Sequence, residues 1–153
     1  MLRLVGLCGA DDQTNISQMI ELSIKYPFIE WGILFHSSKY REARYPSWEW
    51  VYNLVKNDFN LAAHFCGKYV NDLLCGETTF LKKIINLGFS RIQINATKAN
   101  QVDLIQFSNV KYHLIKIFKK FPQVEFILQR NDETEDLCVQ VETVFLTNVS
   151  YLY

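Results

Sequence analysis

The sequence of 153 residues lacks the features that define several large classes of protein. No apolar run approaches the ~18 residues of a membrane-spanning helix. The opening apolar stretch is short and is soon followed by Asp11 and Asp12, unlike a secretory signal peptide. Neither charge sign is in excess, because 16 Lys and Arg balance 16 Asp and Glu, which argues against a broad nucleic-acid footprint. We therefore expect a cytoplasmic protein that binds neither a membrane nor nucleic acid.

The sequence is equally poor in metal-binding and cofactor-binding patterns. Its four cysteines are scattered without C-x-x-C spacing, at Cys8, Cys66, Cys75 and Cys138, which favours reduced thiols. His64 and Cys66 share one face of an expected strand, but two donors are too few for a zinc site. Glycine-rich phosphate fingerprints and Ser-His-Asp patterns are missing. We expect no metal and no cofactor.

The sequence is rich in apolar residues (49%) and aromatic residues (14%), enough for one sizeable core. Short apolar runs with the length of buried strands alternate with segments of helical periodicity. The expected strands are 2–8, 28–35, 61–65, 91–95, 124–128 and 149–153. The expected helices are 12–26, 46–55, 68–74, 78–87, 102–121 and 134–141, several of them closed by proline or glycine. Residues 1–153 are expected to form a single α/β domain.

No hairpin turn joins two of these strands, which indicates βαβ units and a parallel sheet. Two architectures fit this pattern: an open doubly wound sheet and a (β/α)8 TIM barrel. Gln93 and Asn95 lie on one face of the strand 91–95, and a barrel interior tolerates such polar side chains better than a sheet covered on both faces. The run 149–153 reads as a strand with no helix after it. We expect an incomplete TIM barrel with its first six strands; the doubly wound sheet is the alternative.

Polar side chains gather where each expected strand ends. Ligands bind at the carboxyl ends of parallel strands in both architectures, so these clusters would meet at one rim. In chain order the clusters contain Cys8; His36, Lys39, Arg41 and Arg44; His64 and Cys66; Gln93 and Asn95; Gln129 and Arg130. Guanidinium groups suit carboxylate and phosphate, which predicts a small anionic metabolite as the partner.

Each cluster also has a structural interpretation. Cys8 beside Gly9 fits a small buried residue at a tight turn as well as it fits a general base. A histidine at a strand end, such as His36 or His64, is commonly a hydrogen-bonded structural residue. The cations of residues 39–44 also fit a solvated loop. Residue types alone leave these alternatives open.

Residues 3–9, with the sequence Arg-Leu-Val-Gly-Leu-Cys-Gly, resemble the K-x-C-G start of phosphoribosylanthranilate isomerase, and residues 31–47 are similar to that enzyme's second strand and loop. Over almost its whole length the chain resembles a group of barrel proteins described as similar to that isomerase. The likeness lies in residues 9–12 (Gly-Ala-Asp-Asp), 26–33 (Tyr-Pro-Phe-Ile-Glu-Trp-Gly-Ile), 64–67 (His-Phe-Cys-Gly) and 91–95 (Arg-Ile-Gln-Ile-Asn).

The resemblance implies a TIM barrel and an Amadori rearrangement in which a cysteine and an aspartate act as base and acid. Cys8 would be the base. The acid would follow the sixth strand, directly after Tyr153, and the phosphate-binding residues would follow a seventh and an eighth strand. We expect a phosphoribosylanthranilate isomerase-like protein that acts on or binds a small phosphorylated sugar derivative. The residues expected to bind it are His36, Lys39, Arg41, Arg44, His64, Asn95 and Arg130.

The alternative is a non-catalytic binding or scaffold protein for an anionic metabolite. Whether the chain alone is an enzyme stays open, because the expected acid is missing from it. An incomplete barrel would also leave its first and sixth strands as edges, which predicts self-association through them.

Overall fold

The computed structural model describes residues 5–9, 13–35, 61–97 and 107–152, and side chains within 18–35, 62–97 and 112–152. Six parallel strands form one sheet in the order β1-β2-β3-β4-β5-β6. The strands are β1 (Val5–Gly9), β2 (Glu30–Phe35), β3 (Leu61–Phe65), β4 (Arg91–Ile94), β5 (Glu125–Gln129) and β6 (Val149–Leu152). The helices are α1 (Gln13–Lys25), α3 (Lys68–Leu74), α4 (Thr79–Asn86), α6 (Phe107–Lys120) and α7 (Glu135–Glu142). The predicted α/β fold with alternating strands and helices is confirmed.

The ends of these elements follow local signals in the chain. α3 and β3 have the predicted bounds. α1 ends two residues before Pro27 and α6 ends two residues before Pro122, because proline lacks the N–H that a helix interior requires. The predicted helix 46–55 and the beginning of the predicted helix 102–121 lie outside the described residues.

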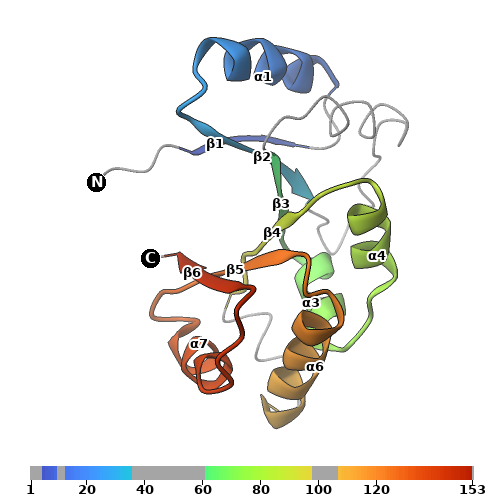
Figure 1. The fold of residues 1–153 in the computed structure, drawn as a ribbon, viewed down its shortest axis with the longest axis vertical. Coiled ribbons are helices and arrows are strands. Elements are labelled where there is room, and N and C mark those ends of the chain that lie inside the picture. Colours follow the sequence, from blue (N-terminus) through green and yellow to red (C-terminus); the bar gives the residue numbers. More distant parts are fainter. Residues whose placement is uncertain (1–4, 10–12, 36–60, 98–106, 153) are drawn as a thin grey trace.

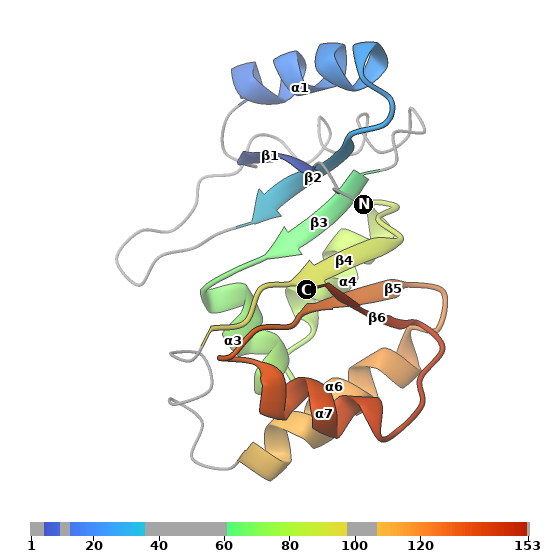
Figure 2. The ribbon, with the colours of Figure 1, turned by 90° about the vertical axis from the view of Figure 1, so that its left-hand side faces the viewer.

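The sheet is bent, and the helices lie along its outer side (Figure 1), with α1 beyond β1 and β2 and with α6 and α7 beyond β5 (Figure 2). Alternate residues of β2, β3, β4 and β5 face these helices. Ile33, Ala63, Ile92 and Phe126 form one row of the sheet and belong to the hydrophobic core. The core is completed by buried side chains of the helices, among them Leu73, Leu74, Leu81, Ile84, Leu114, Phe118, Leu137 and Val141.

The next row of the sheet belongs to the opposite face, called the inner face here. It contains Leu34, His64, Gln93 and Ile127, of which the last three are buried. Successive strand residues point to opposite faces, so these side chains are separated from the core by the sheet itself. The inner face therefore mixes polar and apolar side chains, in contrast to the apolar face under the helices.

An ion-pair layer lies on the inner face at the amino ends of the strands. Arg91 Nε is 3.3 Å from Glu125 Oε2, and Arg91 Nη2 is 4.0 Å from Glu30 Oε1. The hydroxyl of Ser150 donates to Glu125 Oε1 at 3.0 Å. These ion pairs and this hydrogen bond connect side chains of β2, β4, β5 and β6 at the amino-terminal end of the inner face.

Strand order bears on the architecture. A doubly wound sheet reverses its strand order at one point, whereas the six described strands follow chain order throughout. β1 and β6 each pair with a single neighbour among the described strands, and self-association through them stays a prediction. Within the described residues no helix is long and apolar enough to cross a bilayer.

Gly76 ends α3 in a conformation that side chains disfavour. Its φ is +83°, its N–H donates to Leu73 O at 3.0 Å, and the next N–H, of Glu77, donates to Asp72 O at 2.7 Å. This pair of bonds is a Schellman motif, which satisfies carbonyls left open at the helix end. Gly88, with φ +106°, follows α4, and its N–H donates to Ile85 O at 2.9 Å.

Replacing Gly76 by alanine is expected to lower the free energy of unfolding by about 1–2 kcal/mol, because a side chain strains the left-handed backbone. An added Cβ would also lie 2.7 Å from Nδ1 of His113 on α6. Urea denaturation followed by circular dichroism measures the loss. In the double variant with His113→Ala, the clash is gone and part of the loss should be recovered. A Gly76→Ala protein as stable as the parent would contradict this account.

Candidate functional site

Polar side chains of β3 and β4 meet on the inner face at the carboxyl ends of the strands. His64 and Gln93 are neighbours in the sheet register, and Cys66 and Asn95 follow two residues later, one residue beyond the ends of β3 and β4. Because the side-chain period of a strand is two residues, all four belong to one face. The prediction that Gln93 and Asn95 share a face is confirmed by the hydrogen bond between their side chains.

A chain of hydrogen bonds links three of these side chains. Gln93 Nε2 donates to Asn95 Oδ1 at 2.8 Å, and Asn95 Nδ2 donates to Cys66 Sγ at 3.4 Å. The backbone holds the same residues in place, since Asn95 N–H donates to Phe65 O at 3.0 Å and Cys66 N–H donates to Phe35 O at 3.1 Å. The sheet ladder thus continues one residue beyond β3 and β4 and positions the amide–thiol chain.

The electrostatic character of this cluster is neutral. Burial raises the pKa of the Cys66 thiol, and the hydrogen bond from Asn95 only partly opposes that shift. Since a free thiol titrates near pH 8.5, Cys66 carries its proton at neutral pH. Gln93 is buried and Asn95 half-buried, so the cluster presents amide and thiol groups that donate and accept hydrogen bonds without a formal charge.

His64 stands beside this chain in the middle of the inner face. Its side chain is only 3% exposed, and its neighbours across the sheet are Leu34 and Gln93. The structure therefore brings together two of the predicted binding residues, His64 and Asn95.

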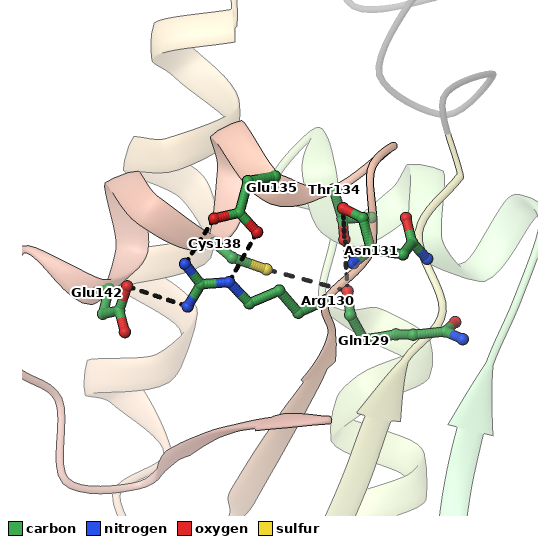
Figure 3. A network of polar contacts seen from close by, with 7 residues as sticks. All are labelled: Gln129, Arg130, Asn131, Thr134, Glu135, Cys138 and Glu142. Atoms are coloured by element: carbon green, nitrogen blue, oxygen red, sulfur yellow. Dashed lines mark hydrogen bonds and ion pairs between the residues drawn. The ribbon is translucent and has the colours of Figure 1, made fainter. Parts of the chain in front are cut away.

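Arg130 is placed differently from His64 and Asn95. Its guanidinium donates two hydrogen bonds to Glu135, from Nε to Oε2 at 2.8 Å and from Nη2 to Oε1 at 2.7 Å. Nη1 donates a third, to Glu142 Oε2 at 3.1 Å. The same group lies over the ring of Tyr151, 5.6 Å from its centroid. Figure 3 shows the side chains of Arg130 and Gln129 leaving the strand in opposite directions. Arg130, directly after β5, therefore connects the end of that strand to α7 through two ion pairs.

The turn between β5 and α7 is held by a second polar cluster (Figure 3). The buried hydroxyl of Thr134 donates to Gln129 O at 2.6 Å, and Asn131 N–H donates to Thr134 Oγ1 at 3.0 Å. Asn131 Oδ1 accepts from Glu133 N–H at 2.9 Å, as in an Asx turn. These bonds are local to the turn and set the direction in which α7 leaves the sheet.

The remaining predicted site residues lie outside the described side chains. His36, Lys39, Arg41 and Arg44 fall within residues 36–60, which are not described. The backbone of Cys8 is part of β1, where it is aligned with Ile33, in the row next to that of His64. Its side chain is not described, and its role as a base stays a prediction.

Three polar residues belong to the predicted strand-end clusters but are not among the residues expected to bind the metabolite: Gln93, Cys66 and Gln129. The signal that identifies them is spacing, because each lies two residues from another inner-face position. Asn95 and Gln129 follow the paired residues Ile94 and Leu128, which places both at the same end of the inner face.

In the described ranges no three His, Cys, Asp or Glu side chains come together as metal ligands would. Comparison with protein families, with curated proteins and with solved structures gives no match to this chain.

Proposed function

We propose that the chain forms an arc of a (β/α)8 barrel whose carboxyl-end rim binds a small phosphorylated sugar derivative, as in a phosphoribosylanthranilate isomerase-like protein. Support for the arc comes from the strands, which are parallel and in chain order, and from the helices along the outer side of the bend. In folds of this kind ligands bind at the carboxyl ends of the strands.

The observation that carries the binding proposal is the amide–thiol chain of Gln93, Asn95 and Cys66 beside the buried His64. Sugar hydroxyls both donate and accept hydrogen bonds, and amide groups offer both functions in fixed positions. The phosphate would be held by the cations of residues 39–44. The sugar hydroxyls would form hydrogen bonds with the uncharged side chains of Gln93, Asn95 and Cys66.

Binding is tested with ribose 5-phosphate, titrated into isotopically labelled protein and followed by amide chemical shifts. We expect shifts at residues 64–66 and 93–95, and an affinity about tenfold lower for Asn95→Ala, because two hydrogen bonds of about 0.5–1.5 kcal/mol are involved. Asn86→Ala is the matched control, since Asn86 is an exposed amide at the end of α4 and should leave affinity unchanged. Equal affinities for Asn95→Ala and the parent protein would refute the site.

A second candidate is non-catalytic binding of the same metabolite at the same rim. It is favoured by the raised pKa of Cys66, because a protonated thiol beside two amides offers no general base. Catalysis would then depend on Cys8, as the resemblance implies. Incubation with the isomerase substrate separates the two: product formation supports the isomerase, and saturable binding without product supports the binding protein.

A further inference from the structure

Gln93 has a hydrogen-bond acceptor that no described residue uses. The residue is only 9% exposed and lies on the inner face between His64 and Ile127. Its Nε2 donates to Asn95 Oδ1 at 2.8 Å, and this is the one hydrogen bond that the Gln93 side chain forms within the described residues. Buried polar groups are nearly always hydrogen-bonded, so Oε1 of Gln93 is a position for a donor on a ligand.

A hydrogen-bond donor of Asn95 accompanies this acceptor. Asn95 Nδ2 carries two N–H groups, and the bond to Cys66 Sγ at 3.4 Å uses one of them. Because Gln93 and Asn95 are joined by their own hydrogen bond, the open oxygen of Gln93 and the second N–H of Asn95 belong to one pair of amides. A carboxamide on a ligand offers an N–H donor and a carbonyl acceptor, which complement this pair.

The surroundings of the two amides do not favour a carboxylate. No described cation forms a hydrogen bond or ion pair with Gln93 or Asn95. The two described cations that follow β3 and β5 interact with acids of the helices: Arg130 is paired with two glutamates of α7, and Lys68 acts on Asp72 of its own helix. A carboxylate oxygen cannot donate to Gln93 Oε1, and its charge would be buried beside neutral groups.

We propose that Gln93 and Asn95 recognise an uncharged carboxamide on the ligand. The N–H of that group donates to Gln93 Oε1, and its carbonyl oxygen accepts from Asn95 Nδ2. This inference rests on the proposed binding of a sugar phosphate at the carboxyl-end rim, and it adds the class of ligand: a phosphorylated sugar that carries a carboxamide instead of a carboxylic acid. Gln93 is then a specificity-determining residue.

The test compares nicotinamide mononucleotide with nicotinic acid mononucleotide, which share a ribose phosphate and differ only in carboxamide against carboxylate. Each is titrated into labelled protein, with ribose 5-phosphate in parallel, and followed by amide chemical shifts. We expect shifts at residues 93–95 and an affinity about tenfold higher for the amide form, because the acid leaves a buried acceptor unpaired.

A pair of variants assigns this preference to Gln93. Gln93→Met keeps the length of the side chain without its acceptor, so the two mononucleotides should bind with nearly equal affinity. The matched control Gln140→Met makes the same change on α7 and should leave the preference about tenfold. The ratio of the two affinities reports recognition of the amide, since a general loss of stability would weaken both ligands together.

Three results would overturn amide recognition. The parent protein would bind the acid as well as the amide, Gln93→Met would retain the parent's preference, or neither mononucleotide would bind. Binding of ribose 5-phosphate with shifts at residues 64–66 and 93–95 would leave the rim proposal standing in each case. Failure of ribose 5-phosphate and of both mononucleotides to bind would refute the rim proposal and amide recognition together.

Discussion

Replacing Phe126 by alanine is expected to lower the free energy of unfolding by about 3–5 kcal/mol, the range for large aromatic side chains removed from a core. Phe126 lies in β5, between β4 and β6, and is fully buried. Its ring packs against that of Phe118 on α6, with 4.7 Å between centroids. The substitution therefore opens a cavity between the sheet and a helix, and neighbouring groups can refill it only in part.

Urea denaturation followed by circular dichroism measures this loss. Phe28→Ala is the matched control, because Phe28 is 71% exposed and its removal should change stability by no more than about 0.5 kcal/mol. If Phe126→Ala does not fold, Phe126→Leu retains most of the volume and should show a smaller loss in the same direction. A Phe126→Ala protein within 1 kcal/mol of the parent would mean that β5 and α6 do not pack as described.

Replacing Asn148 by alanine is expected to cost about 1–3 kcal/mol of stability, the cost of leaving polar groups without their partners. The Asn148 side chain lies just before β6, and its Nδ2 donates to three carbonyl oxygens: Phe118 at 3.0 Å, Phe121 at 3.1 Å and Val124 at 3.1 Å. These carbonyls belong to the end of α6 and to the turn into β5. One amide thus closes a helix end and anchors the sixth strand.

The same denaturation measurement tests this prediction, with Asn86→Ala as an exposed-amide control that should be neutral. Asn148→Asp has nearly the same shape but replaces the donor by a carboxylate facing three carbonyl oxygens. It should destabilise the protein at neutral pH at least as much as alanine does. Stability equal to the parent in both variants would show that the Asn148 amide contributes nothing to folding.

Much of the fold could be predicted from local sequence. The apolar run 61–65 is β3, and the helical period of 68–74 is α3. Gly76 and Gly88 end their helices with positive φ. These features depend on residues within a few positions of one another, so periodicity and turn chemistry reveal them.

The site could be predicted only in part, because some of its contacts join residues close in sequence and others join residues far apart in sequence. The shared face of Gln93 and Asn95 follows from a two-residue spacing and is confirmed by their hydrogen bond. The hydrogen bond from Asn95 to Cys66 joins residues 29 positions apart, so no local sequence pattern predicts it. Arg130 comes directly after β5, as predicted, but its side chain turns to Glu135 and Glu142 on α7.

The sequence by itself determined the order of strands and helices, their approximate bounds and the polar ends of the strands, because side-chain periodicity and capping act over a few residues. Only the tertiary structure decided the sheet register, the neighbours of Asn95 and the partners of Arg130. Such contacts depend on where whole elements pack, and packing is governed by the burial of the shared core.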